Sequence, residues 1–338
     1  MASPNDNYVP RVPEAEPRRL GQFVDRVATV FNDLLRRGDI TRDNQNRFQL
    51  AGGGGGGSGG GGNETSGFRL TASSTEPVPT GDLTAESTLY LSPYAGNGIA
   101  LYTGTAWVVR TSPQVSIDLS GLLTTDKNFD VFAAWTGSAV ELSLSAAWAN
   151  DSTRTDAVTQ LDGVWVLSGD HGKRLVGTVR ATSGSEVEDS LTKRYVWNAD
   201  NRVRRPLRYL ASGGTHTYTI ATWRPTNANN AAGVGCVCGA VGGAVNLTVV
   251  QISDNAGNGG RWVGVGVNSL AANSAQLITA PHVAGNGYSF AWYDATPAVG
   301  FTQYTWLEIS AASGTTTWID SYSAEVDEAF GMRGFVDC

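Results

Sequence analysis

A run of glycine interrupts this chain of 338 residues near its N-terminus. The eleven positions from Gly52 to Gly62 hold ten glycines and a single serine. Glycine has no side chain to bury and loses the most conformational freedom on ordering, so such a run cannot build a core, a helix or an ordinary strand. As a random coil it spans roughly 18 Å, and fully stretched it reaches about 35–40 Å. The run either tethers the N-terminal segment to the rest of the chain or orders where several chains meet.

The segment before the glycine run predicts one amphipathic helix over residues 18–37. Its apolar residues recur at three- and four-residue steps, which places them on one stripe. Gly38 suits the C-terminal end of such a helix. A single helix of this length is marginal in water, so we expect residues 1–50 to be an anchor whose stripe packs on copies of itself or on another protein. The alternative is that the stripe docks on the chain's own β-rich part. The stripe residues are Leu20, Phe23, Val24, Val27, Val30, Phe31, Leu34 and Leu35.

The residues after the glycine run predict a mainly β fold. Charged residues make up only 16% of the chain, and its 42 glycines suit many turns between short strands. We expect a Gly-rich linker over 51–66, a β-rich domain over 67–210 and a C-terminal β-sandwich over 211–338. The last of these holds seven strand candidates at regular spacing, which favours a jelly-roll-like or Greek-key sandwich. A run near 324–330 fits either a short helix or a last strand.

Charge and hydropathy exclude several classes of partner. The net charge of -7 and the pI of about 5.0 argue against nucleic acid. No apolar run approaches the roughly 20 residues that cross a bilayer, and the polar, Pro-rich N-terminus lacks the apolar core of a secretory signal. We therefore expect a protein made in a cytoplasm, without nucleic-acid partners and without membrane insertion.

The cysteines and histidines do not form a metal-binding pattern. Cys236 and Cys238 share one face of a strand, where we expect small buried thiols. The alternative is a Cys/His metal site, but the three histidines are scattered and none stands at ligand spacing from another. We expect no metal and no cofactor. The histidines are His171, His216 and His282, and the third cysteine is Cys338.

Four arginines close the central domain and have two interpretations. They bind something acidic, or they lie on a solvated surface paired with acidic residues of the chain. The arginines are Arg202, Arg204, Arg205 and Arg208, and the candidate partners are Glu186, Glu188 and Asp189.

No motif indicates an enzyme. The chain has no Gly-x-Ser-x-Gly elbow, no P-loop, no dinucleotide fingerprint and no zinc helix. The run "DNAGNGG" from Asp254 fits a hairpin turn better than a calcium loop. No two carboxylates of residues 211–338 stand at a spacing that forces the geometry of a glycoside hydrolase. We therefore expect a protein without catalytic residues.

Two strand candidates near the C-terminus predict a glycan-binding face. In "TQYTWLEIS" and "TTTWIDSYS" aromatic residues and carboxylates alternate with the residues on the opposite face. If "SAASG" makes a tight hairpin, Trp306 lies opposite Asp320, and rings and carboxylates together suit sugar recognition. The alternative is that this face is a core layer or a subunit contact. The candidate residues are Tyr304, Trp306, Glu308, Trp318, Asp320 and Tyr322.

The middle of the chain carries a resemblance to a known group of proteins. It lies between about Leu89 and Leu207, in phrases such as "LYLSPYAGNGIALYTGTAWVVR", "DGVWVLSGD" and "EDSLTKRYVWNADNRVRRPL". This segment resembles a β-rich module of tailed-bacteriophage virion structural proteins, among them tail fibres and spikes. The resemblance implies a virion part, commonly trimeric, with an N-terminal anchor and a distal β-rich head. It implies no catalytic residues.

These observations lead to one functional hypothesis and two alternatives. The hypothesis is a non-enzymatic fibre or spike subunit in the virion, joined to other virion proteins through its N-terminus, whose C-terminal sandwich contacts a host-surface glycan or another receptor. The first alternative is a head fibre, collar or capsid decoration protein without a receptor role. The second is a depolymerase that cleaves capsule or lipopolysaccharide.

Overall fold

The structure is a computed structural model that describes residues 40–42, 48–50, 62–211, 214–257, 259–281, 285–323 and 326–338. The predicted helix with its stripe, the glycines 52–61 and His282 lie outside the described residues. The chain divides into two compact units, Met1–Gly59 and Gly60–Cys338. In the first unit β1 (Ile40–Arg42) pairs with β2 (Phe48–Leu50) in an antiparallel hairpin.

The second unit is built of strands, which confirms the mainly β class. In the described part of the chain the one helical element is the short 3-10 turn η1 (Thr226–Ala228). The strands up to residue 210 are β3 (Phe68–Thr71), β4 (Leu83–Glu86), β5 (Thr88–Pro93), β6 (Gly98–Tyr102), β7 (Trp107–Thr111), β8 (Val115–Asp118), β9 (Asn128–Trp135), β10 (Val140–Leu144), β11 (Val158–Leu161), β12 (Val164–Leu167), β13 (Asp170–Arg180), β14 (Val187–Asp189), β15 (Lys193–Arg194), β16 (Val196–Asn198) and β17 (Arg204–Leu210).

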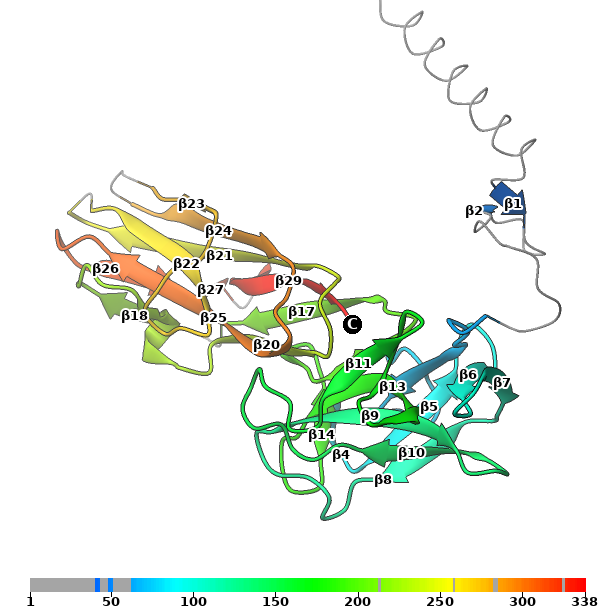
Figure 1. Cartoon of the computed structure of the whole chain (residues 1–338). Helices are drawn as coiled ribbons and strands as arrows, with labels where there is room; N and C mark the ends of the chain where they lie inside the picture. The colour runs from blue at the N-terminus through cyan, green and yellow to red at the C-terminus, as the bar shows by residue number, and fades with distance from the viewer. Residues whose placement is uncertain are drawn as a thin grey trace, which may run out of the picture. The chain divides into compact units, whose positions relative to one another are not determined.

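The remaining strands follow one another closely along the chain (Figure 1). They are β18 (Thr215–Tyr218), β19 (Arg224–Pro225), β20 (Gly233–Cys238), β21 (Val245–Asn255), β22 (Arg261–Val267), β23 (Leu277–Thr279), β24 (Gly287–Ala295), β25 (Gly300–Ser310), β26 (Thr316–Ile319), β27 (Ser321–Ser323), β28 (Val326–Ala329) and β29 (Gly331–Asp337). Near 324–330 the described residues therefore form a strand, not a helix.

The first hydrophobic core belongs to the part of the unit that precedes residue 200. A six-stranded sheet has the order β10-β9-β13-β12-β11, with β16 also paired to β13, and a three-stranded sheet has the order β3-β5-β8. Leu70 and Leu91 of the small sheet share one buried cluster with Val131 and Val179 of the large one. Because successive residues of a strand point to opposite faces, the alternating apolar residues of these short segments are enough to fill this core.

The second core lies between two seven-stranded sheets. One has the order β19-β25-β20-β15-β14-β4, with β22 paired to β25, and the other has the order β17-β29-β21-β24-β23, with β26 paired to β21 and β18 to β26. Val263 and Trp306 of the first sheet share a buried cluster with Val249 and Met332 of the second. Two sheets that share one core form a two-layer arrangement, with the inner faces in contact.

Strand pairing crosses residue 210, where the sequence predicts a domain boundary. The strand β17, which ends at Leu210, pairs along its whole length with β29 at the C-terminus. The short strand β15 pairs in parallel with β20, and Trp197 packs in the second core. The boundary at 210/211 stays a prediction, but a cut there would separate paired strands.

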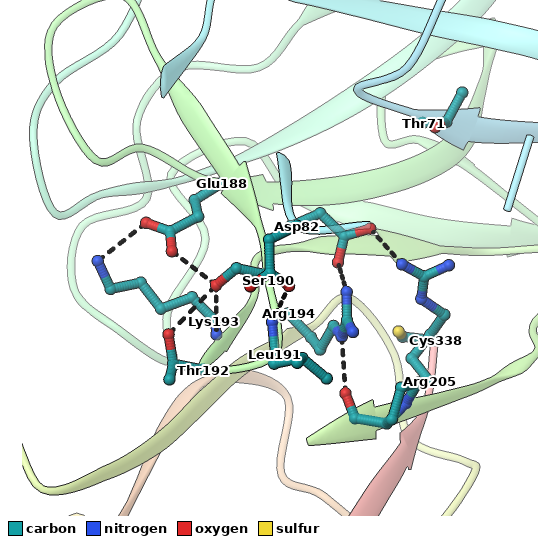
Figure 2. A network of polar contacts seen from close by, with 12 residues as sticks. Thr71, Asp82, Glu188, Ser190, Leu191, Thr192, Lys193, Arg194, Arg205 and Cys338 are labelled. Atoms are coloured by element: carbon teal, nitrogen blue, oxygen red, sulfur yellow. Dashed lines mark hydrogen bonds and ion pairs between the residues drawn. The ribbon is translucent and has the colours of Figure 1, made fainter. Parts of the chain in front are cut away.

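A buried ion network joins β14 and β15 of one seven-stranded sheet to β17 of the other (Figure 2). The Asp189 carboxylate binds the guanidinium groups of Arg194 and Arg205 at 2.9 and 3.0 Å. Close by, the ammonium group of Lys193 lies 2.9 Å from the Glu188 carboxylate. Arg205 pairs with Asp189, one of the predicted acidic partners, so the pairing is confirmed for this arginine. The predicted surface position is wrong for Arg205, because its side chain is buried.

The three cysteines are free and buried. Cys236 and Cys238 lie on β20 and belong to the second core, so the prediction of buried thiols is confirmed. Burial raises the pKa of the Cys338 thiol to about 12. A thiol with so high a pKa stays protonated and unreactive at neutral pH.

The turn at "DNAGNGG" is not a hairpin. The strand β21 ends at Asn255, and β22 begins at Arg261 in the other seven-stranded sheet. The Asn255 side-chain oxygen accepts hydrogen bonds from the backbone N–H groups of Gly257 and Gly259, at 2.8 and 3.2 Å. This Asx turn folds the chain over from one sheet to the other.

Candidate functional site

The predicted glycan-binding face is buried. Trp306 and Trp318 are 0% exposed and Tyr304 is 1% exposed, so none of these rings can stack on a sugar. The interpretation of this face as a glycan-binding surface is therefore wrong for these residues, and the core-layer alternative describes them. Tyr322 lies in β27, and its side chain is outside the described part.

The predicted hairpin at "SAASG" does not form. The strands β25 and β26 belong to different sheets, and Trp306 pairs with Val265 of β22 instead of lying opposite Asp320. Thr305 and Leu307, on the other face of β25, are also 0% exposed. Both faces of this strand are therefore covered, and the second sheet packs over the tryptophan side.

The two predicted carboxylates nevertheless meet, at a histidine that the sequence does not single out. The Glu308 Oε2 lies 2.7 Å from the His216 Nε2, and the Asp320 Oδ2 lies 3.5 Å from the His216 Nδ1. The side chains of all three are less than a tenth exposed. His216 lies on β18, which pairs with β26, and this pairing brings it over the end of β25.

Two further groups satisfy the Glu308 carboxylate. The Arg224 Nε donates to Oε1 at 2.8 Å, and the Thr226 hydroxyl donates to Oε2 at 3.1 Å. Two carboxylates therefore face one guanidinium and one imidazole, and the charges balance when His216 is protonated. Burial lowers the pKa of His216, but the nearby Asp320 and Glu308 carboxylates outweigh it and raise the pKa to about 9.

In the fold this carboxylate–histidine cluster is a set of buried charged groups that pair with one another. Its carboxylates are closed to a polymeric substrate, whereas a glycoside hydrolase needs both of them at an open cleft. They also approach opposite nitrogens of one imidazole ring and do not converge on a common point. Consistently, no group of His, Cys, Asp or Glu among the described side chains is arranged to hold a metal ion.

The cluster makes stability depend on pH. Because the fold raises the His216 pKa from 6.5 to about 9, its contribution to the free energy of unfolding is complete below pH 6.5 and is lost as the pH rises through about 9. We expect urea unfolding at pH 6 to 10 to show this loss in the wild type and a flatter profile in His216→Gln. Parallel profiles for the two proteins would show that His216 is not charged in the fold.

The exposed apolar side chains gather on another strand of the second unit. On β24 the side chains of Tyr288, Phe290 and Trp292 are 49%, 43% and 40% exposed, while Ser289 and Ala291 between them are buried. The neighbouring exposed residues of the same sheet are Leu277 on β23, which pairs with Trp292, and Leu210 on β17. We call these five residues, Leu210, Leu277, Tyr288, Phe290 and Trp292, the aromatic face.

The register of the sheet shows that the aromatic face is continuous. Leu210 pairs with Gly331, Gly331 with Val250, and Val250 with Phe290, so Leu210 and Phe290 lie in one cross-strand row and point to one side. The rings of Tyr288 and Phe290 are stacked, with centroids 6.2 Å apart and an interplanar angle of 27°. A groove of about 740 Å³ lies beside the rings, and Leu210 and Tyr288 of the aromatic face line it.

Two arginines line the same groove. Arg208 of β17 and Arg333 of β29 are register partners and both are exposed. Among the described side chains neither guanidinium has a hydrogen bond or an ion pair. Like charges directly opposite each other destabilise a sheet, so an anion at this position would relieve a local repulsion.

The sequence does carry a signal for the aromatic face. In "GYSFAWYDA" three aromatic residues stand two positions apart and alternate with small ones, which is the pattern of a strand with one fully apolar face. The pattern predicts the strand, but it does not say whether the apolar face is covered. Only the sheet order leaves the rings exposed, because no sheet in the described part of the chain packs over this side of β24.

Comparison with known proteins gives no relative of this chain: no family model matches it, and no curated protein matches it. The resemblance of residues 89–207 to a phage virion module stays a prediction. In the described part of the chain, no helix has the length and apolar character needed to cross a membrane.

Proposed function

We propose that the chain is a non-enzymatic subunit of a tailed-bacteriophage tail fibre or spike. In this proposal residues 1–50 attach it to other virion proteins, three copies assemble into one appendage, and the region 211–338 is a jelly-roll-like distal head. The aromatic face contacts an anionic glycan on the host surface. The observation that carries the proposal is the aromatic face itself, because five large apolar side chains on one side of a sheet are left to water.

Exposed apolar surface of this kind indicates a binding partner. Soluble monomers rarely expose a contiguous apolar patch larger than a few hundred Å², and such patches usually mark an interaction site. Burying one large apolar side chain is worth about 1.5–3 kcal/mol, so covering the rings of β24 favours association strongly. The order of a predicted helix, a glycine run and a β-rich body suits an anchored part that presents such a surface away from its attachment.

The chemistry of the surface favours an anionic glycan as that partner. Aromatic rings such as Tyr288 and Trp292 stack on the apolar faces of sugar rings. The guanidinium groups of Arg208 and Arg333 bind carboxylate or phosphate groups through paired hydrogen bonds. Three copies of a weak site on one appendage would add avidity without any new contact.

Surface substitutions test the proposal better than truncation does. Removing residues 211–338 would take away β29, the partner of β17, and would unfold more than the head. We expect a Phe290→Ser/Trp292→Ser variant of the full chain, labelled with a fluorophore, to bind host cells at least tenfold more weakly than the wild type, as loss of more than about 1.4 kcal/mol of binding requires. Leu122→Ser, an exposed apolar residue outside the aromatic face, is the matched control.

Three outcomes separate the proposal from its alternatives. Unchanged binding of the variant to cells removes the receptor role. If binding is unchanged and light scattering shows fewer copies per particle, the aromatic face is a contact between subunits or with another virion protein. Release of reducing sugar from host polysaccharide by the purified chain supports the depolymerase alternative.

A further inference from the structure

A second groove lies on the first part of the unit, far along the chain from the aromatic face. It has a volume of about 760 Å³ and opens among the turns of three hairpins. These turns join β6 to β7, β9 to β10, and β12 to β13. Small-molecule sites in proteins typically occupy about 300–1,000 Å³, so the groove has the size of a ligand site.

Two of the three turns repeat the same short sequence. Thr103 to Ala106 reads Thr-Gly-Thr-Ala, and Thr136 to Ala139 reads Thr-Gly-Ser-Ala. In each turn the threonine backbone N–H and hydroxyl both donate to the alanine carbonyl, at 2.9 and 3.0 Å in the first and 3.0 and 3.2 Å in the second. The glycines have φ values of 97° and 103°, which other residues rarely adopt. Both rims of the groove are therefore held in a fixed shape.

An aromatic residue directly precedes each of these turns, and both line the groove. The Tyr102 ring lies 5.4 Å from the Trp107 ring and 6.4 Å from the His171 imidazole, measured between centroids. The Trp107 Nε1 donates to the Asp162 Oδ2 at 2.9 Å, which fixes that ring. On the opposite rim, the guanidinium of Arg110 lies 4.4 Å over the Trp135 ring. Partly exposed rings held by these contacts therefore line the groove on two sides.

Polar groups of both charges stand beside the rings. The Asp170 side chain is 53% exposed and pairs loosely with Lys173 at 3.7 Å. The Arg110 guanidinium has no hydrogen bond or ion pair among the described residues, and its terminal nitrogens, unlike the buried Nε, are free to donate to a ligand in the groove. One carboxylate and one guanidinium give no excess of either sign, unlike the paired arginines of the aromatic face.

We propose that this groove binds a short neutral oligosaccharide. A pyranose ring stacks on Tyr102 and packs against the exposed part of Trp135, and sugar hydroxyls donate to the Asp170 carboxylate and accept from Arg110. Stacking together with a few fixed polar groups is the combination that a polyhydroxylated ring of low charge needs. The inference concerns a site separate from the aromatic face and holds whether or not the chain belongs to a virion.

The test uses the full chain and a panel of neutral di- to tetrasaccharides of hexoses and N-acetylhexosamines. Saturation-transfer NMR finds the binders, and titration calorimetry measures affinity. We expect at least one panel member to bind, with Asp170→Asn and His171→Ala each weakening its affinity at least fivefold, and Trp135→Ala abolishing it. Tyr94→Ala, an aromatic residue that is 48% exposed outside the groove, should leave affinity unchanged.

The three substituted residues differ in burial. Asp170 and His171 are exposed, so their replacement should not alter the melting temperature, whereas Trp135 partly packs against the first core. The proposal is overturned if no panel member binds, or if Asp170→Asn and His171→Ala bind as well as the wild type. If the chain binds a saccharide of the panel but does not bind host cells, the proposed function is contradicted and the inference about this groove is not.

Discussion

Replacing Asp189 with alanine is expected to lower the free energy of unfolding by about 3–5 kcal/mol, the usual effect of breaking a buried ion pair from one side. The carboxylate binds Arg194 and Arg205 at once, and the side chains of all three are less than a tenth exposed. Without it, two positive charges remain next to each other out of water. The free energy of unfolding falls because the two guanidinium groups stay buried, out of contact with water, without the carboxylate that they share in the wild type.

Urea unfolding followed by tryptophan fluorescence measures this effect. Asp189→Asn keeps the shape and removes the charge, so it should lose nearly as much stability as the alanine variant. Lys173→Met breaks an exposed ion pair and should change stability by less than about 1 kcal/mol. A loss of less than about 1 kcal/mol for Asp189→Ala would mean that water or another group reaches the two arginines.

Replacing Glu308 with alanine is expected to have a comparable effect, about 3–5 kcal/mol at pH 6. The 0% exposed carboxylate accepts from Arg224, Thr226 and His216, so its removal leaves the guanidinium without a carboxylate partner and the imidazolium with Asp320 alone. The His216 pKa should then fall from its value of about 9. As the pH rises through that value, His216 of the wild type loses its charge and with it the ion pair to Glu308. The difference in free energy of unfolding between the wild type and Glu308→Ala should therefore become smaller.

The pH series separates this structural role from a catalytic one. A stability gap that narrows between pH 6 and pH 10 shows that Glu308 and His216 interact as charges in the fold. A Glu308→Gln variant that is as stable as the wild type at every pH would contradict this role. If that stable variant also loses a measurable polysaccharide-cleaving activity, Glu308 is a catalytic group and the depolymerase alternative holds.

Much of the fold could be predicted from local pattern. Alternation in segments such as 287–295 and 129–144 fixes strands, because one face of each must be apolar to pack. The pairing of β9 with β10 follows from the Thr-Gly-Ser-Ala turn, which leaves a hairpin as the simplest connection. Burial of Cys236 and Cys238 follows in the same way from their small size and their place in an apolar strand.

The candidate sites were harder to predict. Trp306 and Trp292 both alternate with other residues on strands rich in aromatics, yet the first is fully buried and the second is 40% exposed. A strand pattern distinguishes two faces but does not say which sheet will cover them. His216 shows the same limit, since its carboxylate partners are 92 and 104 residues away in sequence, at positions 308 and 320.

The sequence by itself determined that this chain is mainly β, that its thiols are buried and that a glycine run precedes the β-rich body, because these follow from the side chains of neighbouring residues. Only the tertiary structure decided that the predicted glycan face is core, that Glu308 and Asp320 meet at His216, and that the rings of β24 and the groove at Trp135 face water. The physical reason is that burial depends on which sheets stack and in what register. That choice is made by contacts between residues far apart in the chain, which no local pattern contains.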